Sequence, residues 1–87
     1  MCTYQTHIVE LEGSGKGAGG WFAATTASVY VDHPVHAMAE HTLNVDLHNP
    51  AEGAAARVAM ELEPTAARAL AESILRALDE TPPDLLG

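Results

Sequence analysis

Hydrophobic and polar residues alternate along several segments in the first two thirds of the chain. Residues 3–11 are rich in β-branched and aromatic side chains and end at a glycine-rich stretch, residues 13–20. In residues 21–31, alternate side chains share a face of an extended chain, and both faces are partly apolar. These patterns predict a first and a second strand on either side of the glycines.

The clearest alternation covers residues 41–48, where the odd-numbered positions from Leu43 to Leu47 are aliphatic and the even-numbered positions are polar. Residues 56–63 alternate in the same way. The connecting segment 49–53 contains several turn-forming residues. We therefore expect a third and a fourth strand that form an antiparallel hairpin.

Beyond Pro64 the apolar residues recur at helical spacing, at Ala67, Leu70, Ala71, Ile74 and Leu78. Pro64 suits the first turn of a helix, Thr65 is an alternative cap, and the helix should end near Glu80. The pattern predicts a single domain over residues 1–87 with an α+β fold. It is a four-stranded antiparallel meander (β-β-β-β-α) with one C-terminal helix packed on one sheet face.

Composition changes this picture by limiting the core. The chain has 87 residues, of which 47% are hydrophobic but only 5% are aromatic, so the core consists mostly of small aliphatic side chains. A domain of this size is marginally stable alone, and self-association is a common way to bury more surface. We therefore expect a homodimer. The sheet face away from the helix should be exposed to solvent, bind a ligand or form the dimer contact.

The charge excludes several partners. Twelve acidic residues against four basic ones give a net charge of −8, which repels nucleic acids and anionic lipids and attracts metal cations. No apolar run approaches the roughly 20 residues that span a membrane. The single cysteine, Cys2, cannot form an internal disulfide, and no secretory signal is visible, so we expect a cytoplasmic protein.

Candidate chemistry is concentrated in one segment that contains four of the five histidines: His33, His36, His41 and His48. Neutral imidazole is the commonest transition-metal ligand. Because Pro34 favours a loop, we expect His33, His36 and His41 to converge on one metal ion. Three imidazoles and a water are typical of catalytic zinc, and copper, iron or nickel also accept such ligands.

Other residues would complete or support that metal site. Asp32, Glu40 and Cys2 are possible additional ligands or orienting groups. His48 is expected to lie outside it, since it follows His41 by seven residues, on the opposite strand face and roughly 23 Å away. The spacing matches no strong metal signature. The histidines therefore have an alternative interpretation as loop residues that make hydrogen bonds or face water.

Two further functions stay open. One is a metal-free small enzyme or ligand-binding domain of bacterial secondary metabolism, in which a histidine paired with Asp32 or Glu40 acts as a general base on a small molecule. His36, Glu40 and Tyr30 are its candidate catalytic residues. The other is a structural dimeric interaction module.

The glycine-rich stretch, residues 13–20, is not a phosphate-binding loop. Gly17 follows Lys16 where such a loop requires Ser or Thr, and a strand follows where a helix should begin. We expect a flexible hairpin loop there.

Several motifs resemble a family of small uncharacterised actinobacterial proteins. They are Met1-Cys-Thr-Tyr4, Gly13-Ser-Gly-Lys-Gly17, Gly20-Trp-Phe22, Asp32-His-Pro-Val-His-Ala37 and Glu40-His-Thr-Leu-Asn44. The resemblance covers almost the whole chain. It implies a free-standing bacterial protein and no particular activity, fold or ligand.

Overall fold

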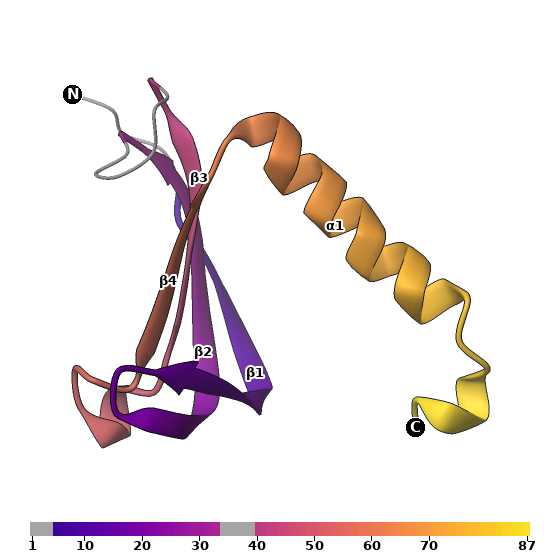
Figure 1. Ribbon diagram of the computed structural model, residues 1–87, viewed down its shortest axis with the longest axis horizontal. Coiled ribbons are helices and arrows are strands. Elements are labelled where there is room, and N and C mark those ends of the chain that lie inside the picture. The colour runs from indigo at the N-terminus through magenta and orange to yellow at the C-terminus, as the bar shows by residue number, and fades with distance from the viewer. Residues whose placement is uncertain (1–4, 34–39) are drawn as a thin grey trace.

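A single antiparallel sheet followed by one long helix makes up the fold (Figure 1). The computed structural model describes residues 5–33 and 40–87. The strands are β1 (His7–Gly17), β2 (Gly20–Asp32), β3 (Thr42–His48) and β4 (Arg57–Leu62), and the helix is α1 (Pro64–Asp79). Strands adjacent in sequence are adjacent in the sheet, in the order β1-β2-β3-β4. The predicted α+β meander is confirmed.

The glycine-rich stretch belongs to the sheet, so the prediction of a loop over residues 13–20 is wrong. Strand β1 continues to Gly17, and the hairpin turn consists of two residues, Ala18 and Gly19. The pairing shifts register between Glu10 and Gly13, where β1 carries one extra residue. Such a bulge bends a strand. Figure 1 shows the end of this hairpin turned across the lower end of the sheet.

A small core forms where the turned hairpin meets the start of β4. Phe22, Ala24 and Ala56 are buried together, with Leu11 and Val58 packed against them. Small residues dominate because the backbones approach closely at this end of the sheet. The composition predicted a core made mostly of small aliphatic side chains, and the structure adds Phe22 to them.

The register separates the rest of the sheet into an apolar and a polar face. Ala27 pairs with Leu47, and Val29 pairs with Val45. The residues between them in sequence, among them Ser28, point to the other face. The alternation in residues 41–48 predicted these two faces correctly.

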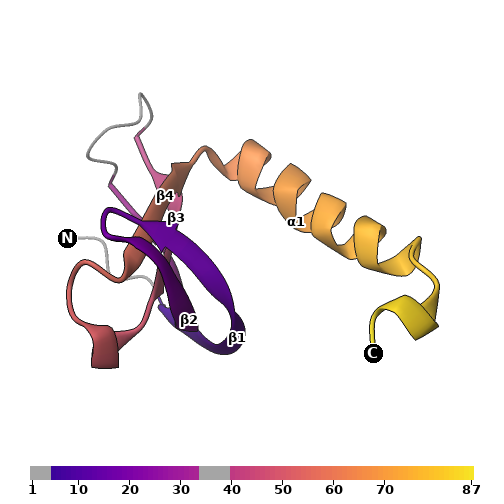
Figure 2. The same cartoon turned by 60° about the horizontal axis from the view of Figure 1, so that its bottom comes forward.

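The helix leaves the sheet instead of covering it, which corrects the prediction of a helix packed on one sheet face. It begins at Pro64, as the sequence indicates, but none of its residues is buried. Only its first turns contact the sheet, and Ile74 and Leu75 are 53% and 61% exposed. Because Glu63 alone separates β4 from α1, no loop is available to turn the helix back (Figures 1 and 2). Among the described residues, no helix combines the length and apolar character needed to cross a membrane.

Candidate functional site

Several polar side chains interact with one another on the polar face of β2, β3 and β4. Ser28 pairs across the sheet with Asp46, and Tyr30 pairs with Asn44. On the next strand, Arg57 pairs with His48. Alternation along each strand directs these side chains to one surface.

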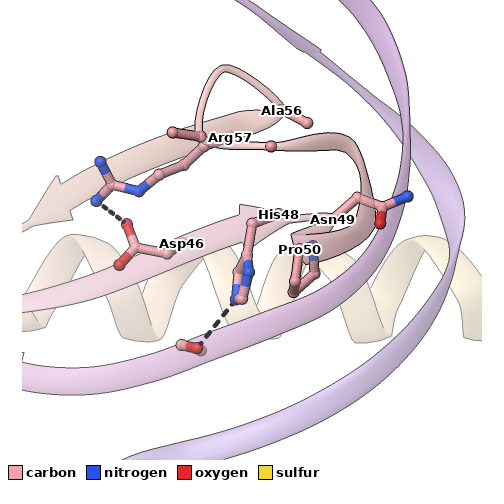
Figure 3. Close-up of a pocket in the computed structure, with 9 residues that line it drawn as sticks. Asp46, His48, Asn49, Pro50, Ala56 and Arg57 are labelled. Atoms are coloured by element: carbon pink, nitrogen blue, oxygen red, sulfur yellow. Dashed lines mark hydrogen bonds and ion pairs between the residues drawn. The ribbon is translucent and has the colours of Figure 1, made fainter.

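Asp46 is held through both of its carboxylate oxygens. The Tyr30 hydroxyl donates to Oδ2 at 3.0 Å, and Arg57 Nη2 donates to Oδ1 at 2.8 Å. The Asp46 side chain is only 16% exposed, whereas that of Arg57 is 53% exposed. The carboxylate is therefore fixed, while about half of the Arg57 side chain stays exposed; Figure 3 shows the pair.

Burial raises the pKa of the Tyr30 phenol. The hydrogen bond to Asp46 and the negative charge of that carboxylate also raise this pKa, while Asn44 and the Arg57 charge lower it. Tyr30 consequently stays protonated at neutral pH and acts as a hydrogen-bond donor to Asp46.

His48 follows Asp46 by two residues along β3, so its side chain lies on the same face of the sheet. Its Nε2 is 3.4 Å from the Ser28 hydroxyl oxygen. Either group can be the donor, depending on the imidazole tautomer. Figure 3 shows this contact among the residues that line a pocket, beside the Asp46–Arg57 pair. A base and a hydroxyl in this position can exchange a proton with a bound molecule.

The connection between β3 and β4 forms the other wall of the pocket. Asn49 is buried, caps the short 3₁₀ turn Pro50–Glu52 by accepting from the Ala51 backbone N–H, and donates to the carbonyl of Ala23 on β2. These bonds hold the connection against the sheet. The cavity has a volume of about 460 Å³. It is lined by Ser28, Asp46, His48, Asn49, Pro50, Gly53, Ala54, Ala56 and Arg57.

At the opposite end of β3, two imidazoles lie together. The ring centroids of His33 and His41 are 4.5 Å apart, with the rings tilted by 33°. They meet because the last β2–β3 pair, Asp32 with Thr42, joins the chain segments on either side. His33 Nδ1 is 3.1 Å from the Glu40 carbonyl oxygen, and the His33 backbone N–H donates to Asp32 Oδ1 at 2.7 Å.

The sequence matches a family of unknown function, DUF6295, over residues 1–87. The chain belongs to the DUF6295 family. This confirms the resemblance to an uncharacterised family that the motifs indicate. Searches of curated proteins and of solved structures found no match.

The structure places the predicted site residues of this DUF6295 protein in two groups. His33, His41, Asp32 and Glu40 lie at one end of β3, whereas Tyr30 contacts Asp46 in the middle of the polar face. His36 and Cys2 lie outside the described residues. In residues 5–33 and 40–87, no three histidine, cysteine or carboxylate side chains are arranged to hold a metal ion. The three-histidine site therefore stays a prediction.

Sequence reasoning missed the pocket of this DUF6295 protein, although it placed Asp46 and His48 on one face. It left out Ser28 and Arg57, which complete the pocket from the neighbouring strands. The position of Arg57 could have been predicted from the sequence, because a hairpin closed by the turn around Pro50 brings Arg57 opposite His48. The register between β2 and β3 had no such signal, because the sequence of residues 33–41 contains no motif that specifies a turn.

Proposed function

We propose that this protein binds a small organic acid in the pocket on the polar sheet face. The observation that supports this function is the cavity of about 460 Å³ in which Ser28, His48 and Arg57 lie side by side. Small-molecule sites typically enclose roughly 300–1,000 Å³, with apolar walls and a few convergent polar groups. This pocket has both features.

The side chains indicate which ligand would fit. A guanidinium carries five N–H donors, and in the described contacts Arg57 uses one for Asp46. The other donors can bind a carboxylate, with the Ser28 hydroxyl and the His48 imidazole beside it. Pro50, Ala54 and Ala56 give the pocket an apolar wall. Asp46 would repel a second acidic group, so a monocarboxylate is favoured.

A titration of isotope-labelled protein with benzoate, followed by NMR, tests this function. Benzoate should shift the amide signals of Ser28, His48 and Arg57 saturably, whereas benzamide, its neutral analogue, should bind much more weakly. Arg57→Gln should weaken benzoate binding by about tenfold or more, because it removes the cation that pairs with the carboxylate.

His48→Gln and His7→Gln form a matched pair for the same titration. His48 lines the pocket, whereas His7 pairs with Val29 on the other sheet face. The first substitution should reduce affinity and the second should leave it unchanged. Equal binding of benzoate and benzamide, or no saturable shift with either, would exclude an acid-binding pocket.

We propose as a second candidate that His33 and His41 bind a transition-metal ion. The specific support is their 4.5 Å ring separation. In metal sites the second ring nitrogen of a ligating histidine commonly donates to a backbone carbonyl, and His33 Nδ1 lies within hydrogen-bond distance of the Glu40 carbonyl. Zinc, copper, iron and nickel all accept imidazole ligands.

Calorimetric titration with Zn²⁺ and Ni²⁺, together with metal analysis of the untagged protein, tests the second candidate. His33→Ala and His41→Ala should each abolish stoichiometric binding, and His36→Ala reports on the third predicted ligand. His7→Ala is the control and should bind as the wild type does. Binding that survives both His33→Ala and His41→Ala would place the metal elsewhere.

A further inference from the structure

Two apolar surfaces of this chain face one another across an open wedge. The first is the apolar face of the sheet, which the register assigns to Val9, Ala27, Val29, Val31, Leu43, Val45, Leu47, Val58, Met60 and Leu62. Most of these side chains are only partly buried, and Val9 and Val31 are exposed. Among the described residues, only the first turns of α1 contact this face.

The second surface is the apolar stripe of α1. Ala67, Leu70, Ala71, Ile74, Leu75 and Leu78 follow one another at helical spacing on one side of the helix. Near the start of α1, Ala67 and Ala71 line an apolar cavity of about 360 Å³ with Val29 and Leu43 from the sheet. From there the helix diverges from the sheet, and Leu78 is 49% exposed (Figures 1 and 2).

The exposed area of the chain is large for its mass. A compact monomer of 9.1 kDa should expose about 4,900 Å². This chain exposes 6569 Å². Its Cα radius of gyration of 14.5 Å likewise exceeds the value of about 12 Å that is typical of a compact domain of this length. The excess area, about 1,700 Å², is comparable to the area that one partner buries in an obligate homodimer.

We propose that a second copy of this chain closes the wedge, with α1 of each protomer packed on the apolar sheet face of its partner. The two surfaces that need covering are one helix stripe and one sheet face of the same chain. A twofold axis can therefore satisfy both at once, because each contact occurs twice. The contacting surfaces of the second copy are the same helix stripe and sheet face, which match in apolar character; the ionisable side chains beside them are His7 on the sheet face and Arg68 near the start of α1.

The same arrangement leaves the acid-binding pocket open. Ser28, Asp46 and His48 alternate along their strands with the apolar residues and lie on the opposite sheet face. The dimer contact and the ligand pocket thus lie on different sides of the sheet, so an experiment can disprove one proposal without affecting the other.

Sedimentation at micromolar concentration tests the dimer with a matched pair of helix variants. Ile74→Glu places a charge in the stripe, whereas Ser73→Glu places the same charge on the other side of α1. Because a symmetric interface contains each substitution twice, Ile74→Glu should raise the dimer Kd by roughly 100-fold or more. Ser73→Glu should leave the Kd within a few-fold of the wild-type value. A wild-type monomer, or a dimer that tolerates Ile74→Glu, would overturn the proposal.

Cysteine cross-linking tests the helix-on-sheet geometry directly in a Cys2→Ser background. One chain carries Leu78→Cys and the other carries Val45→Cys, in the middle of the apolar face. Mixing and oxidising them should give a covalent heterodimer, and Ser73→Cys in place of Leu78→Cys should give much less. Circular dichroism of each variant verifies that it is folded. Equal cross-linking from Ser73→Cys would overturn the proposed packing.

Discussion

At the scale of single residues, Asp46 organises the polar face of the sheet. Its carboxylate joins Tyr30 on β2 to Arg57 on β4 through β3, so three strands share one network. The sequence predicted the face on which Asp46 lies, because alternation decides that. It did not predict the partners, because they depend on the register between strands. A partly exposed ion pair contributes little by itself, about 0–1 kcal/mol, so the network matters mainly for orienting Arg57.

The raised pKa of Tyr30 predicts a loss of stability in alkali. The phenol has a higher pKa in the folded chain than the ordinary value of 10.0, so its contribution to folding is complete below that pH. The contribution declines as the pH rises through 10 toward the folded pKa. At neutral pH, Tyr30→Phe should lower the free energy of unfolding by about 1 kcal/mol, the net contribution of one hydrogen bond.

Urea unfolding of the wild type and of Tyr30→Phe across the alkaline range checks this prediction. The difference between the two proteins should shrink above about pH 10, since only the wild type carries this ionising phenol. The other titrating groups are the same in both proteins, so their contributions cancel in the difference between the two unfolding free energies. A difference that stays constant with pH would mean that the Tyr30 phenol ionises as readily in the folded state as in the unfolded state.

At the scale of elements, the strands and the helix were largely predictable, and their ends were not. Residues 42–48 and 57–62 form strands almost where alternation places them. Strand β1 extends six residues beyond the predicted end at Leu11, through glycines that have low strand propensity. Close contacts explain two of these glycines, because a Cβ would meet the Phe22 side chain at Gly15 and backbone carbonyls at Gly17, whereas Gly13 has open space. Periodicity carries no information about such contacts.

Gly17 should be the least replaceable of the glycines in the hairpin. A Cβ at this position would lie 2.8 Å from the Arg57 carbonyl oxygen and 2.9 Å from that of Ala55, both backbone atoms that cannot move aside. Gly17→Ala should therefore destabilise the protein by about 1–3 kcal/mol. Gly19→Ala is the matched control, because a Cβ at Gly19 has nothing within 4 Å.

Chemical unfolding followed by the fluorescence of Trp21 measures both glycine variants. Gly19→Ala should remain within about 0.5 kcal/mol of the wild type. Equal stability of the two variants would show that the hairpin end can move away from β4 without cost.

At the scale of the whole molecule, the arrangement of the helix was the feature that sequence could not decide. The apolar stripe of α1 indicates which side of the helix needs a covering surface, and in the structure Ala67 and Ala71 at its start lie beside the sheet while Ile74 and Leu78 stay exposed. A stripe does not specify which surface covers it, and the sheet of the same chain was the simplest choice. In the structure Glu63 alone separates β4 from α1, and the helix continues away from the sheet. In the same way, the histidine spacing led us to expect converging imidazoles. The structure brings the rings of His33 and His41 together, and whether they bind a metal ion stays a prediction.

A dimer makes the stability of the protein depend on its concentration. If folding is coupled to association, raising the protein concentration by roughly 100-fold should stabilise the native state by about 2.7 kcal/mol. The urea midpoint should increase accordingly, and thermal unfolding should show the same trend. For Ile74→Glu the midpoint should be independent of concentration. A wild-type midpoint that does not move with concentration would indicate that each chain folds alone.

Strand β3 serves two unrelated surfaces with consecutive residues. Thr42–His48 gives its even positions to the pocket face and its odd positions to the apolar face. Inserting or deleting a single residue inside this strand would exchange the two sets, placing aliphatic groups on the proposed ligand face and carboxylate and imidazole in the proposed subunit contact. Length variation among homologues should therefore be confined to the connections at either end of β3, with the seven-residue strand itself kept constant.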